Sequence, residues 1–192
     1  MNRSAVRTSV GIVLCGLLAG CMPKMTVEDM KKMRQQKPAE LEKLNRLVGT
    51  WEAGSEAKFA GLDEPMKSTG TSKFEWVLDG WYLMETADAQ MGDVGKMSAR
   101  SLWTWDVKAK KFRIWWFDDW GTTGRGTVTY NEKCDCFCIN ASGSAPWGTS
   151  RGKGCMKFTD DKTMDWCWRE WPGWDALGLF KVADMHGTSK KK

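Results

Sequence analysis

The sequence contains a single histidine, His186, among its 192 residues. It therefore holds no pair of histidines that could bind a metal ion together. It also lacks a Gly-x-Ser-x-Gly elbow and a glycine-rich loop that would cradle phosphate. We accordingly expect no catalytic site, no metal site and no cofactor. The one apolar run, near the N-terminus, is too short to span a membrane stably.

The N-terminus has the layout of an exported bacterial protein. Two arginines precede an apolar region at 10–18, and residues 1–20 together are typical of a signal peptide. The segment Leu18-Ala19-Gly20-Cys21 resembles the lipobox of bacterial lipoproteins, in which the cysteine is lipidated, so the resemblance implies a lipid on Cys21. Residue 22 is Met and not Asp, which by the same resemblance favours the outer membrane. We expect a membrane-anchored lipoprotein that faces the periplasm.

The rest of the chain has little excess of charge of either sign. The formal net charge is +5, and loss of residues 1–20 removes two of the 29 positive side chains, which leaves 27 against 24 acidic ones. Three of these positives are clustered in 189–192, which we expect to be a solvated Lys-rich tail. Because the body is nearly neutral, we expect no nucleic-acid partner.

Short helices are expected in a tether over 21–45. Thr26 precedes two acidic residues, a pattern typical of a helix N-terminus, and predicts a helix to about residue 36. Pro38 is tolerated in the first turn of a second short helix, which ends at Gly49. The apolar face of this second helix consists of Leu41, Leu44 and Val48.

From Gly49 the hydrophobic period changes to two, and residues 46–188 are expected to form one all-β domain. Turn signals separate ten candidate strands. Hairpin-length links without intervening helices exclude a parallel α/β sheet and predict an up-and-down antiparallel β-barrel. The expected strands are 49–58, 66–78, 80–89, 96–106, 111–119, 124–131, 134–142, 150–159, 164–171 and 176–186.

Three motifs carry a resemblance to a known family. They are LNRLVGTWE at 44–52, FEWVLDG at 74–80 and the Trp105-Asp106 hairpin that leads to Phe112. With STGT at 68–71, they resemble the bacterial domain of unknown function 1579, which is similar to lipocalin-like (calycin) barrels. The resemblance covers about residues 40–186 and implies a barrel whose base is plugged by Trp51. In lipocalins an arginine of the last strand packs on this tryptophan, whereas here the last expected strand offers Lys181.

The 13 tryptophans need space inside such a barrel. Alternation predicts an inward aromatic face, which either fills the interior as a core or walls a pocket. We expect a pocket and a non-catalytic binder of a small hydrophobic molecule. The alternative is a structural or interaction lipoprotein whose barrel is filled by its own side chains. The predicted pocket residues are Trp51, Phe74, Trp76, Trp103, Trp105, Phe112, Trp116, Trp166 and Trp168.

Trp115 and Phe117 fall on the opposite face from Trp116, so they are expected to point outward. Exposed aromatic side chains indicate that another surface packs over them, which here could be the N-terminal helices or a second subunit in a homodimer. Glu75, Asp79 and Glu85 are interpreted as scattered charges that belong to no catalytic site.

Five cysteines remain in the expected domain, and their alternation places them on the outer face. A turn near residue 161 puts Cys155 opposite Cys167 at a separation that suits a disulfide, which export would favour. Cys136 or Cys138 could also meet the neighbouring strand, and one of the five must stay unpaired or join two chains. A Cys-x-Cys-x-Cys metal site is the alternative, disfavoured by the ~6.6 Å spacing of alternate strand residues and the lack of a nearby histidine.

Two further alternatives rest on single features. Nitrobindin-like haem barrels, to which the family is similar, use a histidine of the last strand as the axial ligand, and His186 stands near that position. A carbohydrate binder would stack sugars on loop tryptophans. The residues that suggest it are Trp147, Trp171 and Trp174, with Asp175 and Asn140.

Overall fold

The computed structural model describes residues 25–33, 36–145 and 148–192. The expectations for the signal peptide, Cys21 and Trp147 lie outside these residues. The chain divides into two units, 1–36 and 37–192. The described part of the first unit holds helix α1 (Val27–Met33), whose first turn is capped because the Asp29 N–H donates to the hydroxyl of Thr26 at 3.1 Å. No described helix is long and apolar enough to cross a membrane.

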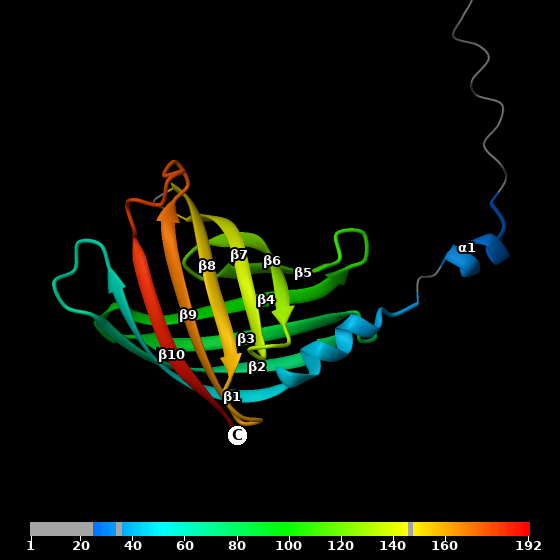
Figure 1. The fold of residues 1–192 in the computed structure, drawn as a ribbon, viewed down its shortest axis with the longest axis horizontal. Helices are drawn as coiled ribbons and strands as arrows, with labels where there is room; N and C mark the ends of the chain where they lie inside the picture. Colours follow the sequence, from blue (N-terminus) through cyan, green and yellow to red (C-terminus); the bar gives the residue numbers. More distant parts are fainter. Residues whose placement is uncertain (1–24, 34–35, 146–147) are drawn as a thin grey trace, which may run out of the picture. The chain divides into compact units, whose positions relative to one another are not determined.

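The second unit is a closed barrel of ten antiparallel strands (Figure 1). Each strand pairs with its neighbours in the sequence, and β1 closes the barrel against β10. This confirms the predicted up-and-down antiparallel barrel. Two 3-10 helices accompany it, η1 (Ala39–Arg46) before β1 and η2 (Gly92–Val94) between β3 and β4. The strands are β1 (Gly49–Phe59), β2 (Met66–Val77), β3 (Tyr82–Met91), β4 (Gly95–Asp106), β5 (Lys111–Asp118), β6 (Thr123–Asn131), β7 (Cys136–Ala145), β8 (Gly148–Phe158), β9 (Thr163–Pro172) and β10 (Ala183–Lys191).

The last strand lies later in the chain than the pattern predicted. Alternation indicated a strand over 176–186, whereas β10 begins at Ala183. Residues 173–182 form a loop instead, in which the carboxylate of Asp175 accepts hydrogen bonds from backbone N–H groups. A side chain that binds the loop's own N–H groups competes with strand pairing, and hydrophobic periodicity does not reveal this competition.

The expected Lys-rich tail is mostly part of β10, which continues to Lys191. The Nζ atom of Lys191 lies 5.2 Å from the centre of the Trp51 ring, so Lys191 occupies the place for which Lys181 was expected. Lys181 pairs with Asp184 at 2.6 Å instead. A cation over an indole contributes about 0.5–1 kcal/mol at an exposed site and more where it is desolvated.

Helix η1 closes one end of the barrel. A 3-10 helix has three residues per turn, so Leu41, Leu44 and Leu47 fall on one face, and all three are buried. An α-helical period would place Val48 on this face in place of Leu47; Val48 is partly buried and packs against the core. The indole N–H of Trp51 donates to the carbonyl oxygen of Leu47 at 2.7 Å, which joins the helix to the plug of the barrel.

Aromatic rings fill the half of the barrel next to η1. Phe137 lies at their centre, with Tyr130 at 4.9 Å, Phe112 at 6.0 Å and Phe158 at 6.2 Å between ring centroids. Tilted and edge-to-face contacts of this kind stabilise a core beyond the area that they bury. The other residues of this core are Leu41, Leu44, Leu47, Trp51, Phe74, Leu83, Trp103, Ile114, Val128 and Met164.

An ion pair fastens η1 to the turn between β6 and β7. Arg46 binds Asp135 at 2.9 Å and lies over the ring of Phe158 at 4.5 Å. Tyr130 donates its hydroxyl proton to Asp135 at 2.5 Å. This hydrogen bond, followed by burial, raises the pKa of Tyr130 to about 12, so the phenol stays protonated and the link persists at neutral pH.

Candidate functional site

The other half of the barrel interior is hollow. A cavity of about 420 Å³ reaches Trp120 and Thr122, in the turn between β5 and β6 at the end of the barrel opposite η1. Its volume lies within the ordinary range for small-molecule sites. Methionine side chains form much of the remaining wall and can adapt to different shapes. The large apolar residues of the wall are Phe59, Met91, Met97, Trp103, Ile114, Trp116, Ile139, Met156, Trp168 and Met185.

Two glycines make room for the indole rings of the wall. A Cβ at Gly124 would lie 2.1 Å from the Trp116 ring, and one at Gly152 would lie 1.9 Å from the Trp168 ring. The two indoles meet edge to face, with centroids 6.4 Å apart and planes at 79°. Glycine inside a strand often marks such a close approach. The sequence therefore contained a signal for this pair of rings that periodicity alone did not use.

Three carboxyl groups line the cavity, those of Glu85, Asp118 and Glu170, and Glu85 is the one whose pKa burial raises. Ser101 donates its hydroxyl proton to Glu85 at 2.7 Å and accepts the indole N–H of Trp103 at 2.8 Å. Burial raises the pKa of Glu85, although hydrogen bonds from Ser101 and Ser72 act in the opposite direction. Glu85 therefore keeps its proton to a higher pH than a surface glutamate and can donate an O–H to an occupant. The interpretation of Glu85 as one of several scattered charges was wrong, because position 85 lies on the inward face of β3 and lines the cavity.

The nine aromatic residues predicted for the pocket separate into groups. Trp103, Trp116 and Trp168 border the cavity. Trp166 donates its indole N–H to Ser189 at 3.2 Å, across the pairing of β9 with β10. The remaining five lie in the filled half or pack against it, and they are Trp51, Phe74, Trp76, Trp105 and Phe112. Sequence reasoning missed Glu85 and the methionines because it ranked inward positions by aromatic character alone. It missed Trp120 because that residue lies in a turn beyond the end of the predicted strand.

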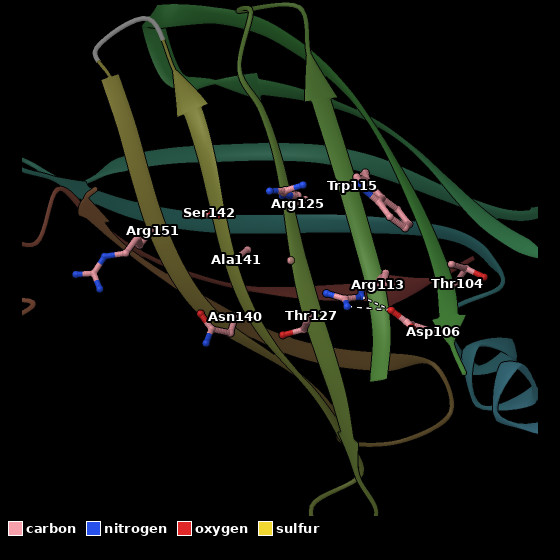
Figure 2. Close-up of a pocket in the computed structure, with 11 residues that line it drawn as sticks. Thr104, Asp106, Arg113, Trp115, Arg125, Thr127, Asn140, Ala141, Ser142 and Arg151 are labelled. Atoms are coloured by element: carbon pink, nitrogen blue, oxygen red, sulfur yellow. Dashed lines mark hydrogen bonds and ion pairs between the residues drawn. The ribbon is translucent and has the colours of Figure 1, made fainter. Parts of the chain in front are cut away.

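A second hollow, of about 780 Å³, lies on the outer face of β4 to β8 (Figure 2). A row of register partners crosses it, formed by Trp115, Arg125, Ser142 and Arg151. Arg113 is held by two 2.9 Å contacts to Asp106, whereas Arg125 is exposed. Arginines and hydroxyl groups around a single indole suit an apolar ligand less well than the interior cavity does.

The two aromatic side chains expected to face outward are exposed. Trp115 is 38% exposed on β5, and Phe117 is 50% exposed two positions later. Of the residues behind the carbohydrate alternative, Trp171 donates its indole N–H to the carbonyl oxygen of Gly178 at 3.1 Å, Asp175 is buried, and Asn140 lies in the outer hollow. Trp174 is exposed on the loop between β9 and β10.

An apolar loop stands at the same end of the barrel as the cavity. Burial alone would raise the pKa of Asp175. Hydrogen bonds from the backbone N–H groups of Phe180, Leu179 and Gly178 outweigh this effect and hold the pKa below its usual value. Arg151 also donates to the carbonyl oxygen of Asp175, so the loop has a defined shape. Its large apolar side chains, exposed by 60% to 82%, are Trp174, Leu177, Leu179 and Phe180.

The cysteines differ from the expected pairing. The structure joins Cys134 to Cys136, while Cys138, Cys155 and Cys167 are free thiols. Cys134 belongs to the turn before β7 rather than to the strand, so its side chain can turn back to Cys136. Cys155 and Cys167 are register partners. The sulfur of Cys155 nevertheless lies 2.8 Å from that of Cys138, on its other neighbouring strand.

His186 lies on the outer face of β10 and is exposed. Its neighbour Met185 faces the cavity, because adjacent strand residues point to opposite sides. The imidazole therefore cannot serve as an axial ligand for a haem inside the barrel, and the position that made His186 a candidate does not fit that role.

Comparison with known proteins gives one family match and several similar solved structures. The sequence profile of DUF1579, described as a protein of unknown function, matches residues 36–166. Among solved structures, Rv2717c from M. tuberculosis is similar with a TM-score of 0.59 and 18% identity, over 82% of this chain and 99% of that one. The barrel EF1p2_mFAP2b bound to DFHBI gives a TM-score of 0.44 and 12% identity, over 79% and 98% of the two chains. No curated protein matches the chain.

Proposed function

The chain belongs to the DUF1579 family of proteins of unknown function, and from its structure we propose that it binds a small, largely apolar molecule inside the barrel. The observation that carries this proposal is the cavity of about 420 Å³ walled by Trp116 and Trp168. A purely structural barrel would gain stability by filling this space with larger side chains. Instead, Gly124 and Gly152 hold the rings against the wall.

The polar groups of the wall define the ligand further. Glu85 and Ser101 are linked by a hydrogen bond of 2.7 Å and lie among apolar residues. A buried site of this kind orients its ligand through a few polar contacts and selects it by shape. The expected ligand is therefore flat and mainly apolar, with a polar group that accepts a hydrogen bond from the O–H of Glu85.

The apolar loop supports access from the open end. Trp174 and Phe180 pack on each other at 5.4 Å and remain exposed, beside the end of the barrel that holds the cavity. Large exposed apolar patches commonly mark places where an apolar ligand or surface is met. An apolar ligand that enters here would pass from one apolar surface to another.

Fluorescence titration tests the proposal with a matched pair of variants. Fatty acids, sterols and flat hydrophobic dyes are added to the full chain while tryptophan emission is followed. Trp116→Phe should weaken binding by roughly tenfold or more, whereas Trp115→Phe, one residue away on the outer face, should leave the affinity unchanged. Equal effects of the two changes, or no member of the panel binding below the millimolar range, would contradict binding in the cavity.

We also propose that Cys21 carries the lipid that anchors the protein to a membrane, facing the periplasm and more specifically at the outer membrane. Supporting this is the match of residues 18–21 to a lipobox. More than one acyl chain is needed for stable anchoring. Growth with a clickable fatty acid should label the wild-type chain and leave Cys21→Ser unlabelled, with the protein then recovered in the soluble fraction. Labelling of the Cys21→Ser chain would disprove the anchor.

Trp115 and Phe117 are proposed as the contact of a homodimer, since both are exposed on one face of β5. Burial of two large aromatic side chains is a common feature of protein interfaces. Size-exclusion chromatography of the wild type and of Trp115→Ser should show a dimer that dissociates in the variant. A wild-type monomer at high concentration would refute this contact.

A further inference from the structure

The five cysteines of the barrel lie close together on one side of it. The disulfide between Cys134 and Cys136 is followed by the sulfur of Cys138, 3.8 Å from that of Cys136. The sulfur of Cys155 is 2.8 Å from that of Cys138. Cys167 lies directly opposite Cys155 in the register of β8 with β9. The five sulfur atoms thus form a row that crosses from β7 and the turn before it, over β8, to β9.

From Cys136 to Cys167, exposure rises along this row of cysteines. Cys136 is 5% exposed, Cys138 and Cys155 are partly buried, and Cys167 is exposed. Only the last of these is freely accessible to a reactant in solution. His186 is the register partner of Cys167 on β10 and is also exposed. Directly opposed residues on one face have Cβ atoms about 4.5–5.5 Å apart, so the imidazole is within reach of the thiol.

We propose that this row is a thiol–disulfide exchange site, in which Cys167 reacts with an external disulfide and the resulting bond comes to rest between Cys138 and Cys155. The external reactant is a small disulfide or the disulfide of another protein. The site lies on the outer face of the barrel and does not depend on the proposed ligand of the cavity.

The reaction proceeds in three balanced exchanges. The Cys167 thiol attacks one sulfur of the external disulfide, forms a mixed disulfide and releases one thiol, which takes the proton. The Cys155 thiol then attacks the sulfur of Cys167, forms the Cys155–Cys167 bond and releases the second external thiol with its proton. Finally, Cys138 attacks Cys155, and Cys167 leaves as a regenerated thiol. Overall, the external disulfide is reduced to two thiols, and Cys138 and Cys155 are oxidised.

The surroundings of each sulfur support this order. Burial, together with the hydrogen bond to Cys138, raises the pKa of Cys155 to about 12. Because the thiolate is the attacking form, Cys155 is a poor first nucleophile, and the first attack falls to exposed Cys167. His186 can accept the proton of Cys167 at this step. The short distance between Cys138 and Cys155 makes that pair the natural end point.

The same sulfurs suggest a competing interpretation. Those of Cys136, Cys138 and Cys155 lie within 4.8 Å of one another, which would also suit a soft metal ion. However, Cys136 is joined to Cys134, and a sulfur in a disulfide is not a thiolate ligand. The arrangement of one disulfide beside three thiols therefore favours exchange chemistry over metal binding.

Oxidised glutathione is the probe for the experiment. The full chain is incubated with it, samples are quenched by alkylation over time, and disulfides are mapped by mass spectrometry. We expect a transient glutathione adduct on Cys167, then a stable Cys138–Cys155 bond, with Cys134–Cys136 retained and Cys167 free at the end. Cys167→Ser should slow formation of the Cys138–Cys155 bond by roughly tenfold or more.

Variants of the other residues separate the steps. Cys155→Ser should accumulate the adduct on Cys167, and Cys138→Ser should stop at the Cys155–Cys167 bond, outcomes that a structural role would not produce. His186→Ala should lower the rate of the first step without changing the products. The proposal is overturned if Cys167→Ser forms the Cys138–Cys155 bond at the wild-type rate. It is also overturned if the purified chain holds a stoichiometric metal ion that protects Cys138 and Cys155 from alkylation.

Discussion

The two halves of the barrel interior are lined by inward-facing residues of the same strands, but one half is filled with side chains and the other is hollow. Next to η1, large side chains such as Trp51, Phe112 and Phe137 are completely buried and in contact. At the other end, the corresponding positions surround a cavity of about 420 Å³. The filled half has a helix to seal it, whereas the hollow half ends in loops. In this barrel, one half of the interior therefore forms a packed core that stabilises the fold, and the other half leaves space for a ligand.

The difference arises from the residues opposite each ring. In the filled half, aromatic side chains face one another, as Phe112 and Phe137 do at 6.0 Å. In the hollow half, Trp116 and Trp168 also meet edge to face, but each ring lies over a glycine, so the pair sits against the wall and leaves the centre open. Close packing is the rule in protein interiors, and a retained cavity of this size is typical of a binding site.

The largest expected effect comes from the plug of the filled half. Trp51→Ala removes a fully buried indole and its hydrogen bond to Leu47, and should lower the free energy of unfolding by about 3–5 kcal/mol. Trp116→Ala borders empty space and should cost less than about 3 kcal/mol, because fewer contacts are lost. Urea denaturation of both variants checks the comparison. Equal losses would show that the halves do not differ in this respect.

A smaller effect on stability, with a larger one on binding, is expected from Gly152→Ala. The new Cβ would lie 1.9 Å from the Trp168 ring and push it into the cavity. Overpacking of this kind typically costs about 1–3 kcal/mol. Affinity for any ligand found by the fluorescence titration should fall with it. Gly54→Ala is the matched control, since a Cβ there meets nothing within 4 Å. Unchanged affinity in Gly152→Ala would place the ligand elsewhere.

Glu85→Gln should change the pH dependence of stability. Because burial raises the pKa of Glu85, the folded chain holds this proton more tightly than the unfolded chain does. The stability contributed by that proton is complete below the ordinary glutamate value of about 4.3 and is lost as pH rises through the folded-state pKa. The variant should lack this decline. Glu75→Gln, whose carboxylate pairs with Lys73 at 2.8 Å, should keep it.

The smallest effect on global stability is expected from Asp175→Asn. The pKa of Asp175 is lowered, so its contribution is present above the ordinary aspartate pKa and is lost as pH falls through the folded value. The variant should therefore resemble the acidified wild type. Hydrogen exchange should quicken at the amides of Gly178 and Phe180 while the melting temperature changes little. Asp63→Asn, in the exposed loop between β1 and β2, is the control, and equal exchange in both variants would deny Asp175 this role.

Much of the barrel could be predicted from local pattern, and the exceptions have local causes. Strands such as β5 follow the alternation of Phe112, Ile114 and Trp116 closely. β10 was misplaced because the apolar residues of 174–180 alternate like a strand, although the carboxylate of Asp175 binds the loop backbone. On η1, Leu41 and Leu44 were predicted correctly, whereas buried Leu47 was missed because the period is three rather than 3.6.

The amino-acid sequence by itself determined the class of fold and the inward face of most strands, because a period of two is a local property of each strand. Only the tertiary structure decided which inward residues form the core and which border a cavity. That outcome depends on closure of β1 against β10, on η1 sealing one end, and on rings such as Trp116 meeting Gly124 of the next strand. Contacts between strands set the empty volume, and no single strand contains that information.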